Sequence, residues 1–371
     1  MTSTPPDIYG TPSKGHFYSP FNLNIDPMKR LLLLNFEKDP DVVYRGLEPQ
    51  VFDDAVNGTG LMVIAYRNDD QVDVYHPPSL KLAHKNFDIV EQGLANLVER
   101  PLKGARYEVT PYGVDLAFSF EDKQGRPIEV RIEENNSKPT KPFDILAPLG
   151  SGTVQPPALP LIFLYDFYFV RRAGTEIQIK VDGKTLKPDT LPMPIDFSRV
   201  FFTRYATNPF VVTWNATHNG PLTPLDPGQA GTYDDQGVIY DLVQNDGHFE
   251  IARMRGRGEK HEITFAFTPP VPDVAGLKDG THLEGAFTIA CEASTGTVSG
   301  VYRVRRHGDQ VELVVHPSGG WQSKPRKWSV KLLFRLVPLF RHWPKTYVWT
   351  ARIDLGTAGA PLMHAAWERV G

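Results

Sequence analysis

Three acid–base side chains stand among apolar residues of this sequence, where they could transfer protons. Asp166 lies within the run LPLIFLYDFYFV (159–170), which would be apolar on both faces as a β-strand. Burial of that kind raises the pKa of a carboxyl group and creates a general acid or base. A salt bridge to Arg171 or Arg172, or hydrogen bonds within a turn, would instead make Asp166 structural.

Strand parity selects Glu134 and His76 as the other two candidates. In IEVRIEEN (128–135), the three apolar side chains alternate along one face, and the same register puts Glu134 on it. In VDVYHPP (72–78), the two valines share a face with His76, whose ordinary pKa suits proton transfer. The alternatives are a strand that ends before Glu134 and a histidine that is packed in the core.

Aromatic side chains near these groups are candidates for the lining of a ligand cavity. Tyr165 and Tyr168 flank Asp166, and Trp214 shares a strand face with Phe210 in NPFVVTWN (208–215). The alternative is that such a face is simply the core of a β-barrel. We therefore predict Asp166, Glu134 and His76 as catalytic groups, with Tyr165, Tyr168 and Trp214 in contact with substrate.

Motifs for metals and cofactors do not stand out. The single Cys291 excludes an intramolecular disulfide and a thiolate cluster, and the eleven histidines show no metal-binding spacing such as HExxH. Neither a phosphate-binding loop nor a GxSxG nucleophile motif occurs. We expect chemistry without a metal or another cofactor.

The elements that must position these groups are short strands. The 371 residues include 33 Pro and 31 Gly, so long helices must be few. Alternating segments are bounded by turns, such as those expected at 68–70 and 123–125, which predicts an all-β, antiparallel fold. Two short helices are expected, one over 28–37 after Asp26 and Pro27, the other over 86–100 from its three- and four-residue apolar spacing.

The Pro-rich stretch from Pro188 to Pro194 is the expected domain boundary. It divides the chain into residues 1–190, which begin with an extended Pro-rich arm up to Pro27, and residues 191–371. Each part holds enough strand candidates for an antiparallel β-barrel. The sequence thus predicts two tandem β-barrels.

Tandem barrels with a Gly-aromatic strand start (Gly300 to Tyr302) and a closing strand that ends Ala366-Trp367-Glu368 resemble the tandem lipocalin-like group. That group includes carotenoid hydratases and pericyclase-type cyclases. The resemblance is one of architecture and carries no catalytic residue onto this sequence. It implies an apolar small-molecule substrate that is held within or between the barrels.

Charge is informative in one segment only. The whole chain has 40 Lys and Arg against 43 Asp and Glu, but residues 321–371 have nine against two. Most of that excess lies in 324–345, where basic residues alternate with Trp, Leu and Phe. Such a segment suits peripheral contact with an anionic membrane; the alternative is core packing with basic side chains that extend outward. We expect no nucleic-acid partner, because the chain is acidic overall and lacks a reading motif.

The N-terminal sequence has no basic stretch followed by an apolar one, and no apolar run reaches the roughly 20 residues of a membrane helix. A cytoplasmic protein is expected, with peripheral membrane association through 324–345 as an open alternative. The leading hypothesis is a lyase- or isomerase-type enzyme, a hydratase or cyclase, acting on a hydrophobic terpenoid, polyene or polyketide. A noncatalytic carrier or sensor of lipophilic ligands and a carbohydrate-active lyase or glycosidase are the alternatives.

Overall fold

The computed structural model describes residues 7–149, 155–228, 231–325, 327–357 and 359–370. About 58% of the chain is β-strand and 6% helical, which confirms the all-β prediction. Within these residues the helices are α1 (Trp328–Leu336), α2 (Pro338–His342) and the 3-10 turns η1 (His84–Phe87) and η2 (Ala293–Thr295). The hairpin turns expected at 68–70 and 123–125 are present.

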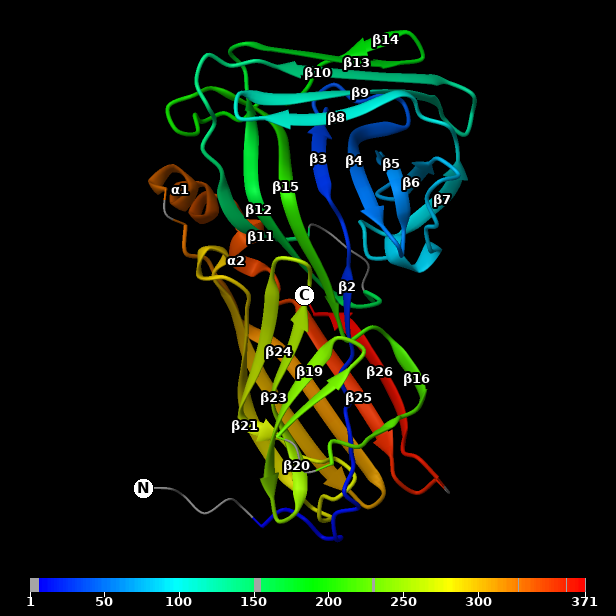
Figure 1. Ribbon diagram of the computed structural model, residues 1–371, viewed down its shortest axis with the longest axis vertical. Coiled ribbons are helices and arrows are strands. Elements are labelled where there is room, and N and C mark those ends of the chain that lie inside the picture. The colour runs from blue at the N-terminus through cyan, green and yellow to red at the C-terminus, as the bar shows by residue number, and fades with distance from the viewer. Residues whose placement is uncertain (1–6, 150–154, 229–230, 326, 358, 371) are drawn as a thin grey trace.

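Two sheets form the upper half of the molecule, where the five-stranded sheet lies across the strands of the nine-stranded sheet (Figure 1). The nine-stranded sheet has the order β11 (Phe143–Ala147), β12 (Leu159–Arg171), β15 (Val200–Trp214), β3 (Arg30–Asn35), β4 (Tyr44–Asp54), β5 (Gly58–Arg67), β6 (Val72–His76), β7 (Leu94–Glu99), with β2 (Leu23–Asp26) also paired to β15. The five-stranded sheet has the order β14 (Lys184–Leu186), β13 (Thr175–Val181), β10 (Pro127–Glu134), β9 (Gly113–Glu121), β8 (Lys103–Thr110).

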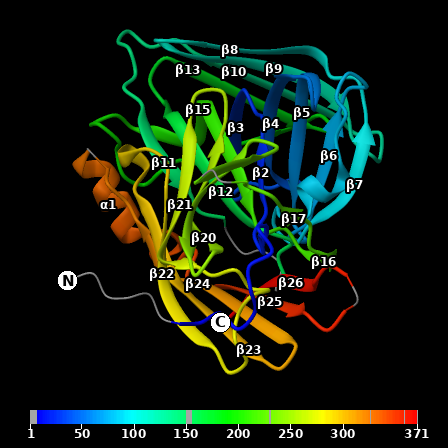
Figure 2. The ribbon, with the colours of Figure 1, turned by 60° about the horizontal axis from the view of Figure 1, so that its bottom comes forward.

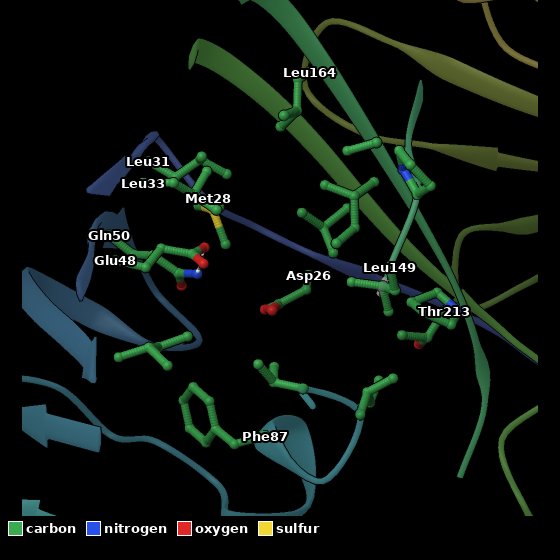
Figure 3. Close-up of a pocket in the computed structure, with 18 of the residues that line it drawn as sticks. Asp26, Met28, Leu31, Leu33, Glu48, Gln50, Phe87, Leu149, Leu164 and Thr213 are labelled. Carbon is green, nitrogen blue, oxygen red and sulfur yellow. Dashed lines mark hydrogen bonds between the residues drawn. The ribbon is translucent and has the colours of Figure 1, made fainter. Parts of the chain in front are cut away.

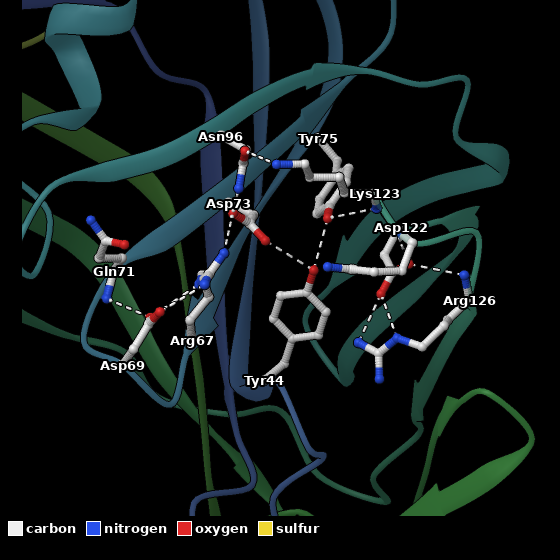
Figure 4. A network of polar contacts seen from close by, with 11 residues as sticks. Tyr44, Arg67, Asp69, Gln71, Asp73, Tyr75, Asn96, Asp122, Lys123 and Arg126 are labelled. Atoms are coloured by element: carbon white, nitrogen blue, oxygen red, sulfur yellow. Dashed lines mark hydrogen bonds and ion pairs between the residues drawn. The ribbon is translucent and has the colours of Figure 1, made fainter.

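A polar network joins the two upper sheets at one end (Figure 4). The fully buried carboxylate of Asp73 accepts hydrogen bonds from Tyr44 at 3.0 Å, Arg67 at 3.2 Å and Asn96 at 2.6 Å. The Tyr44 hydroxyl also lies 2.8 Å from that of Tyr75, which in turn accepts the backbone N–H of the β9–β10 turn. The side-chain polar groups of Asp73, Tyr44 and Tyr75 all have hydrogen-bond partners, as buried polar groups ordinarily do.

The lower half is a strongly curved ten-stranded antiparallel sheet (Figure 1). Its order is β16 (His218–Pro221), β26 (Leu362–Arg369), β25 (Tyr347–Asp354), β24 (Gln310–Gln322), β23 (Thr297–His307), β22 (His282–Ala290), β21 (Glu262–Val271), β20 (His248–Arg257), β19 (Val238–Asn245), β18 (Thr232–Asp235). In the described residues no strand pairing joins β16 to β18. Closure of either half into a barrel therefore stays a prediction.

The N-terminal arm belongs to the interior of the lower sheet. Phe17 and Phe21 are buried there, and the ring of Phe21 stacks on that of Phe267 with centroids 5.2 Å apart. A short two-stranded sheet of β1 (Phe17–Tyr18) and β17 (Pro224–Leu225) holds the arm on its way to β2. Figure 2 shows this blue segment passing from the lower to the upper half.

Strand β15 makes the reverse connection. It follows the expected boundary at 188–194, yet it pairs with β12 and β3 of the upper sheet. Its far end carries Trp214 into the lower core, where the indole packs against Phe265 and Trp367. The upper half thus includes β15 from the second part of the sequence, and the lower half includes the N-terminal arm from the first part.

Both helices predicted from the first hundred residues are wrong. Residues 30–35 form strand β3 because the leucine run is buried on both faces, with Leu32 and Leu34 in the core beneath the five-stranded sheet. Residues 94–99 form β7, which pairs in parallel with β6, and Gly93 at φ +99° interrupts the helical pattern. The α-helices lie instead in the basic segment 324–345.

Among the helices of the described residues, none is both long and apolar enough to cross a bilayer.

Candidate functional site

A cavity of about 680 Å³ opens between the nine-stranded sheet, the segment around η1 and the helix pair α1 and α2. Figure 3 shows it with the side chains that point into it. Most of the lining is apolar, and side chains of β3, β11, β12 and β15 contribute to it. A large apolar cavity with a few polar groups is the usual form of a small-molecule site.

Strand β12 lines the cavity on both sides of its middle. The alternation of its inward-facing side chains shifts there by one position. Pro160, Ile162 and Leu164 face the cavity before the change, and Phe167 and Phe169 face it afterwards. The shift occurs at Asp166, which has a φ of +49°. At this point β12 has one more residue than the paired stretch of β11, which is a β-bulge. The bulge therefore turns both ends of the strand toward one space.

Asp26, the last residue of β2, projects its carboxyl group into the middle of the cavity (Figure 3). Its described hydrogen-bond partner is Asn57, whose Nδ2 lies 3.4 Å from Oδ1. Burial raises the pKa of Asp26 to about 6; the nearby charge of Asp54 raises it further, whereas the Asn57 bond opposes the rise. The group can therefore gain or lose a proton near neutral pH.

Glu48 and Gln50 enter the cavity from alternate positions of β4 (Figure 3). Gln50 donates from Nε2 to Oε1 of Glu48 at 2.7 Å, and the Tyr66 hydroxyl of β5 donates to Oε2. Burial raises the pKa of Glu48, although both bonds and the charge of Arg204 oppose the rise. Because each carboxyl oxygen accepts a hydrogen bond from a protein side chain, Glu48 is held in place in the cavity wall.

Arg204 is the cationic group at the β15 wall. Its Nη1 donates to Asn35 Oδ1 at 2.6 Å and to the carbonyl oxygen of Phe202 at 2.9 Å. The guanidinium carbon also lies 4.2 Å from the centroid of the Phe202 ring. Burial lowers the pKa of Arg204, while Tyr66 and Glu48 support its charge.

The helix pair closes the cavity on the side away from β4. Leu333 of α1, Val337 between the helices, and Leu339 and Phe340 of α2 all contribute to the lining. Trp321, whose ring centroid lies 5.0 Å from that of Phe334, anchors α1 to the lower sheet. Part of segment 324–345 therefore packs inward, as one reading of the sequence expected.

Glu134 and His76, two of the predicted catalytic groups, lie outside this cavity. Glu134 is buried between the upper sheets, where Oε1 accepts from Asn136 Nδ2 at 2.6 Å and from the backbone N–H of Arg171 at 3.1 Å. Burial raises the pKa of Glu134, and Arg171 opposes the rise. His76 is buried at the end of β6 with Nδ1 3.0 Å from the carbonyl oxygen of Pro77.

The third predicted catalytic group, Asp166, is half-buried at the β12 bulge, with its side chain outside the cavity lining. Burial raises the pKa of Asp166, and the charge of Asp144 adds to the rise. Tyr165 turns toward the lower sheet and stacks on His261 at 3.8 Å, while Tyr168 stacks on Tyr205 toward the five-stranded sheet. These three neighbours in sequence therefore face three different environments.

Trp214 also lies away from the cavity, in the core of the lower sheet. The opposite face of β15 provides the lining through Val211 and Thr213. The structure thus brings none of the six predicted site residues into the described cavity lining. Their predicted roles remain predictions, and the ionisable groups described above in the cavity lining are instead Asp26, Glu48 and Arg204.

Sequence reasoning passed over Asp26 because the pair Asp26-Pro27 resembles a helix start. Glu48 and Gln50 alternate with apolar residues in β4, a pattern typical of a solvent-facing strand surface. The available signal was the run Leu31 to Leu34, which is apolar on both faces. A strand that is apolar on both faces must be covered on both faces, so an apolar region is expected on each side of the sheet close to Asp26.

Comparison of the chain with protein-family models, with curated proteins and with solved structures finds no match. Among the described residues, no group of three or more His, Cys, Asp or Glu side chains has the arrangement of a metal site. The geometry of the cavity is therefore the basis for the functional argument.

Proposed function

We propose that the protein is an enzyme that binds an apolar small molecule in this cavity and transfers protons through Asp26. The supporting observation is one carboxyl group with a pKa of about 6 that projects into an otherwise mainly apolar space of about 680 Å³. A terpenoid, polyene or polyketide suits the lining, and the resemblance to the tandem lipocalin-like group points to the same substrates. Hydration, isomerisation or cyclisation are the corresponding reactions.

In the proposed step, protonated Asp26 gives its proton to one carbon of a substrate double bond, and the π electrons form the new C–H bond. The Asp26 carboxylate then faces the cation at the neighbouring carbon. In isomerisation it takes a proton from an adjacent carbon, whose C–H electrons form the shifted double bond. In hydration it takes the proton of a water molecule that adds to the cation, so the carboxyl group is restored in both cases.

A noncatalytic carrier is the second candidate. Glu48 and Arg204 are already held by protein partners, so the cavity could bind a lipophilic molecule without acting on it. The same apolar lining gives little support to the carbohydrate-active alternative, because sugar sites need many free polar partners.

Deuterium exchange separates the enzyme from the carrier. The protein is incubated in D2O with a panel of acyclic terpenoids and polyenes, and products are analysed by mass spectrometry. We expect deuterium incorporation by the wild type and a loss of about 100-fold or more in Asp26→Asn, the scale of a lost general acid. Asp115→Asn, on the five-stranded sheet and outside the cavity lining, is the matched control and should keep the wild-type rate.

Unchanged exchange in Asp26→Asn would overturn the assignment of Asp26. A wild type that binds members of the panel without any exchange would instead identify a carrier. A protein that neither binds nor converts any of them would contradict both proposals.

A further inference from the structure

The outer surface of the helix pair carries exposed apolar residues beside exposed cationic side chains. Trp328 and Leu336 of α1 are 65% and 59% exposed, and Phe197, near Trp328, is 88% exposed. Leu332 and Leu339 complete this surface, which we call the helix patch. A contiguous apolar patch on a protein surface often marks an interaction site, whereas single scattered apolar residues do not.

The spacing in α1 produces this surface directly. Trp328, Leu332 and Leu336 follow one another at intervals of four residues, and Lys331 and Arg335 lie beside them on the same face. The opposite face, which includes Val330 and Leu333 among others, is buried. A helix that packs on one side is ordinarily polar on the other, so the apolar outer face is not required by the fold.

The charge of the helix patch has one sign. Lys331 and Arg335 of α1 and Arg341 of α2 are exposed, and no ion pair in the described residues engages any of them. The nearby Asp196 is paired with Lys327 at 2.5 Å. The sequence has no acidic residue between Glu312 and Asp354. Arg326 lies outside the described residues.

We propose that the helix patch docks on an anionic phospholipid membrane. Trp and Leu side chains enter the headgroup region, and the three cations contact lipid phosphates. A protein partner would fit the apolar residues equally well. The three cations have no ion-pair partner in the described residues, however, and this favours a binding partner whose surface is uniformly negative. The described geometry therefore favours the bilayer over a second copy of this chain.

Docking would also place the cavity next to the bilayer, an extension that rests on the proposed function. The inner side of the same helix pair lines the cavity through Leu333, Val337 and Phe340. Leu339 is both 36% exposed and part of the lining. A lipophilic molecule that leaves the membrane at the helix patch would therefore have only the helix pair between itself and the cavity.

Vesicle co-sedimentation tests the docking on the full-length protein. The vesicles contain about four parts phosphatidylcholine to one part phosphatidylserine, with pure phosphatidylcholine as the comparison. The wild type should bind the anionic vesicles and should lose that binding at high salt. In the triple variant Lys331→Gln, Arg335→Gln and Arg341→Gln, the partition coefficient should fall by about 100-fold.

A matched variant carries the same change in net charge elsewhere. Lys103→Gln, Lys187→Gln and Arg305→Gln alter exposed residues away from the helix patch and should bind like the wild type. The single variants Trp328→Ser and Leu336→Ser test the apolar part and should each weaken binding several-fold. All the changes are at exposed positions, and circular dichroism verifies folding.

Equal loss of binding in the matched triple variant would overturn the proposal, because nonspecific charge would then explain it. Equal binding to both vesicle types, or no binding by the wild type, would do the same. Self-association that depends on Trp328 and Leu336 would identify a dimer surface instead. Retinol binding in vesicle-free solution is measured alongside, so a failure of docking is distinguishable from a failure of the cavity to bind ligand.

Discussion

Asn57 Nδ2 lies 3.4 Å from Asp26 Oδ1. Among the described residues, this long hydrogen bond is the only one to the carboxyl group of Asp26. A bond of that length is weak. It therefore offsets little of the cost of burying the charge, and the pKa of Asp26 is raised to about 6. Proton transfer near neutral pH follows from this poor compensation.

Removing the partner should raise the pKa of Asp26 further. In Asn57→Ala the opposing hydrogen bond is lost while burial and the charge of Asp54 remain. A titration that follows the carboxyl carbon by NMR should show a midpoint above that of the wild type, with Asp26→Asn used to assign the signal. A midpoint at or below the wild-type value would show that Asn57 does not stabilise the charged form.

Asp26 should also make stability depend on pH. Its pKa is about 6 in the folded state against 3.8 ordinarily, so the folded state holds the proton more tightly. The stabilising contribution is complete below about pH 4 and is lost as the pH rises through about 6. The free energy of unfolding of Asp26→Asn minus that of the wild type should therefore be about 2 kcal/mol larger at pH 8 than at pH 4.

Denaturant unfolding of both proteins at the two pH values measures this difference. The comparison isolates Asp26, because every other titrating group is common to both chains. A constant difference between variant and wild type across the pH range would contradict the raised pKa.

The polar network around Asp73 should be structural rather than catalytic. Asp73→Asn removes a fully buried charge that accepts from Tyr44, Arg67 and Asn96, and we expect unfolding to become easier by about 3 kcal/mol. Asp69→Asn, which alters the half-exposed partner of Arg67, should cost less than about 1 kcal/mol. Similar losses in the two variants would show that burial of Asp73 adds nothing.

The expected division near Pro188 can be tested by separating the two parts. Residues 1–190 lack β15, the central partner of β12 and β3, whereas residues 191–371 lack the arm that carries Phe21 into their core. We expect neither fragment to fold alone and both to associate when they are produced together. A dispersed NMR spectrum from either isolated fragment would contradict this interdependence.

Much of the strand pattern could be predicted from the sequence because period-two alternation and turn residues are local signals. The hairpins around 68–70 and 123–125 follow from them directly. The leucine run 31–34 was misread because four consecutive apolar residues have no period that distinguishes a helix from a doubly buried strand. Residues 86–100 had helical spacing, but pairing with β6 prevailed over that local preference.

The candidate site was less predictable because it depends on contacts between distant segments. Parity correctly put Glu134 on a buried face, yet that face packs against another sheet rather than a cavity. At Asp166 the bulge changed the phase of β12, so the side chains next to it face different spaces. Asp26 reaches the cavity because β2 pairs with β15, nearly two hundred residues away.

The binding of all-trans-retinol, followed by its fluorescence, tests the central claim that the cavity holds an apolar molecule. The wild type should bind one retinol per chain, and Ile162→Trp, which fills the cavity from β12, should bind at least tenfold more weakly. Val301→Trp adds the same ring on an exposed strand and should bind like the wild type. Equal affinity in the wild type and Ile162→Trp would contradict the account.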